Sequence, residues 1–129
     1  MPVTYTHDIK QKDVVVMKYE SNWTVAEYEK TYNEMLDYAA KSDQEIYLIS
    51  DFMDSGSVPP NILSLASRTT RQLPENIALI VVINSSRFVT TLIEIAAKLN
   101  RDLGKKTIAV RSREEAYNEV ERHKNSIGK

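Results

Sequence analysis

The sequence predicts an α/β sandwich in which a mixed, mainly parallel five-stranded sheet packs with four helices in the order ββαβαβαβα. Three observations lead to this prediction. Short β-branched runs alternate with segments whose apolar residues recur every three or four positions. Residues 77–83 are apolar throughout, as is typical of a parallel strand covered on both faces. Capping motifs mark helix starts, and 129 residues fit one domain, residues 1–129.

Five segments are expected to form the strands. A weakly alternating stretch near the N-terminus predicts an edge strand, and the polar link at residues 10–13 favours a hairpin to the next strand. Alternation of strands and helices after that hairpin is typical of a parallel sheet. The predicted strands cover residues 3–9, 14–19, 45–51, 77–83 and 106–110.

The first helix is predicted by its start signal. Thr24 and Glu27 form a capping box, in which each side chain accepts a hydrogen bond from the other residue's backbone amide. Trp23 and Tyr28 stand on either side of the cap, at the positions of a hydrophobic staple. Tyr38 is expected to be partly exposed. The apolar stripe of this helix consists of Tyr28, Tyr32, Leu36 and Ala39.

Three further helices are expected. Prolines at positions 59 and 60 favour a helix over residues 58–73, because proline is tolerated in a first turn. Another helix is predicted from about residue 86 to residue 103, with Gly104 at its C′ position. The last helix begins at a second capping box, residues 112–115, and the tail at residues 125–129 is expected to fray. Its inward-facing residues are Ala116, Tyr117 and Val120.

Composition argues against several classes of function. A net charge of −1 offers no bulk attraction for nucleic acid or an anionic membrane. The lack of cysteine excludes thiolate catalysis, while His7 and His123 are expected to be solvated, so we expect no metal and no cofactor. The longest apolar run has seven residues, whereas a membrane span needs about 20. Without a signal peptide or such a span, we expect a cytoplasmic protein.

Three loops are expected to converge at the carboxyl ends of the parallel strands, at residues 51–57, 84–87 and 111–113. Each loop leads into a predicted helix start, where free amides and partial positive charge favour an anion. The alternative is that these side chains are helix caps and a solvated rim. The candidate anion or ligand site consists of Asp51, Asp54, Ser86, Arg87, Arg111, Ser112 and Arg113.

Catalytic machinery is poorly represented in the sequence. The three glycines are scattered and form no phosphate-binding loop, and no histidine is expected at this edge to act as a base. Two nearby carboxylates, at positions 51 and 54, are weak evidence for a divalent ion. We therefore expect that the protein is not an enzyme.

The third predicted helix carries more apolar residues than packing on one sheet requires. The surplus predicts contact with another chain, as in a homodimer, or with an apolar ligand. The alternative is a helix lying deep between its neighbours. The interface candidates are Phe88, Val89, Leu92, Ile93 and Ile95.

The element order and a set of local motifs resemble the SpoIIAA-like proteins, which are small bacterial STAS-type domains related to anti-sigma-factor antagonists. The motifs lie at residues 23–24, 48–55, 58–61, 73–76, 86–88 and 112–116, so the resemblance spans nearly the whole chain. It implies a STAS-like fold with no established enzymatic activity. In phosphorylatable STAS domains a serine at the start of the second helix is switched by a kinase, and Ser55, with its neighbour Ser57, is the matching position here. The alternative for Ser55 is a plain turn or cap.

The expected function is accordingly a non-catalytic STAS-like regulatory or protein-interaction module. The alternative is a binder of a small anionic or lipid-like ligand at the carboxyl edge of the sheet. The likeness of STAS domains to the lipid-transfer CRAL-TRIO folds is consistent with this second function.

Overall fold

Five strands form one sheet in the computed structural model, which describes residues 3–7, 13–55, 74–83, 94, 98 and 101–127. The side chains of residues 5, 7, 102–104 and 127 lie outside that description. The strands are β1 (Val3–His7), β2 (Val14–Ser21), β3 (Ile46–Ser55), β4 (Ile77–Ile83) and β5 (Thr107–Val110). The bounds of β4 match the prediction, because its apolar run is bounded by polar residues on both sides.

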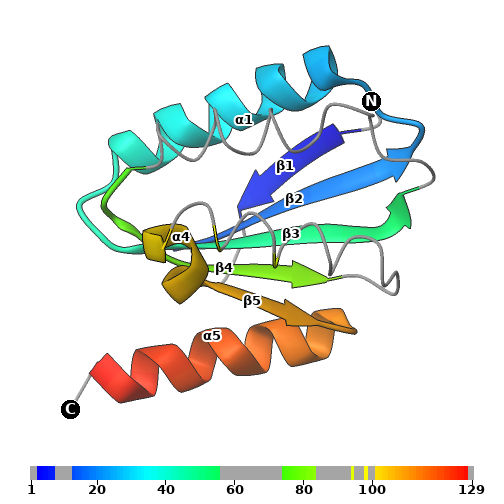
Figure 1. Cartoon of the computed structure of the whole chain (residues 1–129). Helices are drawn as coiled ribbons and strands as arrows, with labels where there is room; N and C mark the ends of the chain where they lie inside the picture. The colour runs from blue at the N-terminus through cyan, green and yellow to red at the C-terminus, as the bar shows by residue number, and fades with distance from the viewer. Residues whose placement is uncertain are drawn as a thin grey trace.

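The sheet has the strand order β1-β2-β3-β4-β5, with only the β1–β2 pair antiparallel among these strands. The mixed, mainly parallel five-stranded sheet is therefore confirmed. The first helix, α1 (Val25–Ala40), covers one face of the sheet, and the last helix, α5 (Arg113–Ile127), covers the other (Figure 1). Strands buried between such layers need apolar residues on both faces, which explains why β4 is apolar throughout and why β2 and β3 each begin with four apolar residues.

The predicted capping box at the start of α1 is present. The Thr24 hydroxyl accepts from the Glu27 amide at 3.2 Å, and the Glu27 carboxylate accepts from the Thr24 amide at 3.0 Å. Trp23 and Tyr28 have ring centroids 6.0 Å apart, as expected for a staple. Tyr32, Met35 and Ala39 are buried against the sheet, while Tyr28, Leu36 and Tyr38 pack at the margin of the same cluster.

The C-terminal segments depart from the prediction in two places. Gly104 was expected just beyond a helix, but it lies inside α4 (Arg101–Lys106), which continues directly into β5. The tail was expected to fray, but α5 remains helical to Ile127. The described part of the chain contains three helices, the long α1 and α5 and the six-residue α4. The helix expected over residues 58–73 lies outside the described residues. Within residues 86–103, Glu94 and Lys98 are helical.

The alternating side chains of the strands divide the core into two clusters. The cluster under α1 contains Met17, Tyr19, Trp23 and Leu48 among its buried members. The cluster under α5 contains Tyr47, with Ala116 and Val120 as the fully buried contributions of the helix. Because β3 supplies Leu48 to one cluster and Tyr47 to the other, its register fixes both helices against the same strand.

Candidate functional site

The carboxyl ends of the parallel strands lie side by side, as the sequence predicts. Asp51 of β3 pairs in register with Ile83 of β4, and Ile83 pairs with Val110 of β5. Residues 51 and 111–113 therefore share one edge of the sheet. Residues 84–87, the third predicted loop, lie outside the described residues.

The segment after Asp51 is a strand rather than the loop predicted over residues 51–57. β3 continues to Ser55 and pairs with β2 as far as Ser21, whereas its described pairing with β4 stops at Asp51. The two strands thus form a ribbon at the edge of the sheet, which we call the β2–β3 ribbon (residues 18–21 and 51–55). The charged residues at 51 and 54 predicted a loop. They lie in a strand because their charges are paired with Arg113 of α5 and Lys18 of β2.

An irregularity in the ribbon sets the direction of its side chains. The β2–β3 register shifts by one residue between Lys18 and Glu20, which places one extra residue on β3 and is the pattern of a β-bulge. Phe52 turns inward and stacks on Tyr19, with ring centroids 4.1 Å apart and an interplanar angle of 8°. Met53 is 46% exposed, and among the described residues it is the one large hydrophobic side chain that is exposed.

Asp51 is buried and forms an ion pair with Arg113 of α5. Its Oδ2 atom accepts from the Arg113 Nη2 at 2.8 Å, and its Oδ1 atom accepts from the Met53 amide at 3.0 Å. The carboxylate is 8% exposed and the guanidinium side chain is 50% exposed. Both oxygens of the buried group are thus engaged, and the contact ties the start of α5 to the end of β3.

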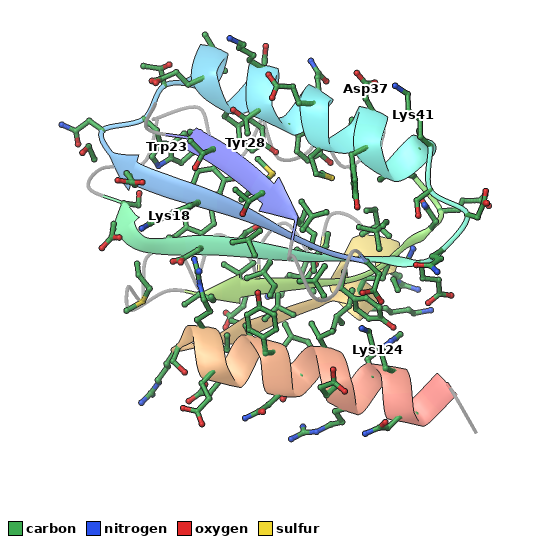
Figure 2. The ribbon with its side chains drawn as sticks, turned by 180° about the vertical axis from the view of Figure 1, so that it is seen from behind. Lys18, Trp23, Tyr28, Asp37, Lys41 and Lys124 are labelled. Carbon is green, nitrogen blue, oxygen red and sulfur yellow. The ribbon has the colours of Figure 1, made fainter. Side chains whose placement is uncertain are left out.

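Lys18 and Asp54 form a second ion pair on the ribbon, at 3.2 Å, with Glu20 at 4.0 Å from the same ammonium. The hydrogen bond that the Lys18 ammonium donates to Asp54, aided by the charge of Glu20, raises the pKa of Lys18 above its usual value. These side chains are exposed, so the pair contributes little to stability. Figure 2 shows Lys18 and Trp23 near the same end of the sheet.

Ser55, the serine that matches the phosphorylated position of STAS domains, closes β3. Its hydroxyl oxygen accepts a hydrogen bond from the Trp23 indole nitrogen at 2.9 Å. Trp23 is itself buried and packs near Tyr19 and Phe52. A phosphate at Ser55 would therefore act on the entry to α1 as well as on the ribbon, and its presence stays a prediction.

Side chains at the start of α5 accept hydrogen bonds from backbone amides that have no partner within the helix. The Ser112 hydroxyl accepts from the Glu115 amide at 3.1 Å, and the Glu115 carboxylate accepts from the Arg111 amide at 3.1 Å. The carboxylate reaches one residue further back than in the predicted capping box. Carboxylates at positions 114 and 115 also stand in the first turn, where an external anion would find the favourable end of the helix dipole.

Several predicted site residues lie outside the described residues. They comprise the second potential switch serine, two members of the anion site and all the interface candidates of the third helix. These residues are Ser57, Ser86, Arg87, Phe88, Val89, Leu92, Ile93 and Ile95.

A polar cluster at the opposite end of α5 was not predicted. The Tyr47 hydroxyl lies 3.0 Å from the His123 Nδ1 atom, and the Lys124 ammonium lies 2.9 Å from the Asp13 carboxylate and 5.4 Å from the Tyr47 ring centroid. The expectation that His123 is solvated is therefore wrong. Burial raises the pKa of Tyr47, and the charge of Glu45 adds to that effect. The available sequence signal was a tyrosine in an apolar strand, since a buried hydroxyl needs a partner.

Comparisons with known proteins show what this fold is similar to. Neither a known protein family nor a curated protein matches the chain. A solved structure does match: an uncharacterised protein of the DUF3478 family with a SpoIIAA-like fold, from Shewanella loihica PV-4. The alignment has a TM-score of 0.65 at 10% sequence identity and covers 90% of this chain and 93% of that chain. The SpoIIAA-like fold that the resemblance predicts is therefore confirmed.

The described residues contain no group of three or more histidine, aspartate or glutamate side chains placed to hold a metal ion. No helix in the described part of the chain is long and apolar enough to cross a membrane.

Proposed function

We propose that the protein is a non-catalytic interaction module that binds a protein partner through the β2–β3 ribbon. The observation that carries this proposal is the state of Asp51, the buried carboxylate at the ribbon's base. Its two oxygens accept from Arg113 and from the Met53 amide. Use of this carboxylate as a base or metal ligand would break a buried ion pair, so its geometry favours a structural role.

The outer surface of the ribbon has the composition of a contact surface. Met53 offers an exposed, flexible apolar side chain, and the Lys18–Asp54 pair supplies charge beside it. Methionine adapts to varied partners, and apolar centres with polar rims are typical of protein interfaces. The stacked Tyr19 and Phe52 rings beneath hold this surface rigidly against the core.

Binding of a small anionic or lipid-like ligand at the same edge is the competing proposal. The charge of Arg113 is already paired with Asp51, and Arg111 stands close in sequence to two acidic residues of the first turn of α5. The nearby carboxylates offset the positive charge, and this favours the protein partner over the anion.

The test places a photo-crosslinking amino acid at Met53 and, as a matched control, at Asn118, an exposed residue of α5. We expect position 53 to capture one protein from the native host that then binds the purified chain, and Met53→Asp to weaken that binding at least tenfold. Equal capture at the two positions would contradict the ribbon as the contact. Thermal stabilisation by inorganic phosphate, a nucleotide or a fatty acid, lost in Arg113→Ala, would instead establish the ligand-binding function.

A further inference from the structure

The charges of the chain are segregated along its sequence. Residues 98–113 contain six basic residues and one acidic residue, whereas residues 27–45 contain six acidic residues and two basic ones. The net charge of −1 conceals this separation. When one chain has a basic region and an acidic region, the basic region of one copy can attract the acidic region of another.

The basic region is concentrated at α4. Arg101 and Lys105 of α4 are exposed and stand four residues apart, the spacing of one helical face, and the nearby Lys98 is also exposed. Lys106 adds a half-buried fourth cation. None of the four forms an ion pair with another described residue, whereas the cations at positions 18, 113, 122 and 124 each do.

The acidic region lies at the end of α1 and in the turn that leads to β3. Asp37, Asp43 and Glu45 are exposed there and form no ion pair among the described residues. The last turn of α1 has no basic residue, so its terminal carbonyls add partial negative charge. Lys41, which caps the helix, is the single cation among residues 37–45.

A neighbouring turn extends this acidic surface. The Asn76 side chain donates to the Ala39 carbonyl at 2.8 Å and to the Gln44 carbonyl at 3.2 Å. These bonds hold the turn before β4, which contains the exposed Glu75, against the end of α1. The carboxylates of this surface are Asp37, Asp43, Glu45 and Glu75.

The two surfaces lie at the same end of the sheet, where the parallel strands begin. Figure 1 shows α4 and the C-terminal end of α1 at that end, and Figure 2 shows the labelled Asp37 and Lys41 there from behind. A two-fold axis can therefore set α4 of one copy against the α1 end of the other, and the reverse contact forms at the same time.

We infer that the chain forms a two-fold symmetric, salt-dependent dimer in which the basic α4 surface of each copy contacts the acidic α1–β3 surface of its partner. This inference rests on the proposed interaction function and names a second copy as a partner at the end opposite the ribbon. A second copy is favoured over an unrelated acidic protein because the complementary charges are present on this chain itself. Contacts of this kind steer association and weaken as salt screens them.

Charge exchange between two variants tests the inference. Variant A carries Arg101→Glu and Lys105→Glu, and variant B carries Asp37→Lys and Asp43→Lys. Each variant alone brings like charges together, so its dimer dissociation constant should rise at least tenfold. An equimolar mixture restores attraction at both contacts and should form the heterodimer, which also demonstrates that both variants are folded.

Sedimentation velocity gives the readout at about 0.1 M salt, where the Debye length is about 10 Å, and at about 1 M, where it is about 3 Å. The wild type should be a dimer at low salt and a monomer at high salt. The matched control, Lys30→Glu with Arg111→Glu, makes the same charge change on exposed residues that belong to neither the α4 surface nor the α1–β3 surface, and it should stay dimeric.

Four outcomes overturn the inference: a monomeric wild type at low salt, a control that dissociates as variant A does, a mixture of A and B that stays monomeric, or assemblies larger than a dimer. A monomer that still crosslinks to a host protein through position 53 refutes the charged dimer and leaves the proposed function standing. A dimer that forms as expected but gives no crosslink at position 53 refutes the proposed contact through the ribbon and leaves the charged dimer standing.

Discussion

Removing the two partners of the Asp51–Arg113 ion pair should have unequal effects on stability. Arg113→Ala leaves a carboxylate that is 8% exposed with a single amide donor, at Met53. Asp51→Asn leaves a guanidinium that is 50% exposed and can be hydrated, and the new side chain can still accept the Met53 bond. An unpaired charge strongly destabilises the folded state where water cannot reach it and destabilises it little where water can.

The expected magnitudes follow from those exposures. Arg113→Ala should lower the free energy of unfolding by about 2–3 kcal/mol, and Asp51→Asn by about 1 kcal/mol. The double variant should cost little more than Asp51→Asn alone, since the orphaned charge is gone, which gives a coupling of about 2 kcal/mol. Arg122→Ala, which removes an exposed pair with Glu119, is the control and should cost less than about 0.5 kcal/mol.

Urea unfolding followed by tryptophan fluorescence supplies these values, because Trp23 is the single tryptophan of the chain and is buried. A two-state transition in all four proteins permits the cycle to be closed. If Arg113→Ala costs no more than Asp51→Asn, or if the coupling is near zero, the carboxylate is not held by the arginine. The structural role assigned to Asp51 would then be lost.

Three other predictions concern single groups. Tyr47→Phe removes the hydroxyl bond to the α5 imidazole and should cost about 1 kcal/mol in urea unfolding. Thr24→Ala should cost about 1 kcal/mol through loss of the α1 cap, and Thr24→Ser should retain most of the stability. Burial raises the pKa of Tyr19 well above 10.0, so its contribution is intact below pH 10, and above it Tyr19 should account for about 1.4 kcal/mol of lost stability per pH unit; the measure is the difference in alkaline unfolding between the wild type and Tyr19→Phe, and parallel profiles would contradict this.

The parts of the fold predicted from the sequence are those determined by local signals. The β4 run and the Thr24 capping box depend on residues close together in the chain, and both were predicted correctly. Gly104 shows the limit of such signals, because glycine favours a helix end only where the backbone adopts a left-handed conformation, and no described glycine does so. Gly104 therefore stands within α4 instead of after a helix.

The sequence predicted that the carboxyl ends of the parallel strands share one edge, but it did not predict the contacts made there. That residues 51 and 111–113 share an edge follows from parallel topology alone. That Asp51 is paired with Arg113, and Ser55 with Trp23, depends on β3 continuing beyond its apolar run. No pattern within residues 51–55 predicts that extension, since Lys18 and Arg113, which neutralise its charges, lie far away in the sequence.

Helix α5 makes polar contacts with the sheet at its two ends in addition to the contacts of its short apolar stripe. Ala116 and Val120 are its fully buried side chains, and burying a valine is worth only about 1.5–3 kcal/mol. Arg113 binds Asp51 at one end, and Lys124 binds Asp13 at the other, at 2.8 and 2.9 Å. These contacts fix the position of the helix along the strands, which a stripe of small residues does not.

A variant with both Asp13→Asn and Asp51→Asn should therefore loosen α5 while the sheet stays folded. In hydrogen exchange, the protection factors of α5 amides should fall about tenfold for each 1.4 kcal/mol by which the free energy of opening α5 decreases. The protection factors of β4 amides, which are buried between the layers, should fall less. Equal loss in both elements would mean that α5 opens only with the whole molecule. In that event its apolar contacts hold it, and the polar contacts at its ends are incidental to its position.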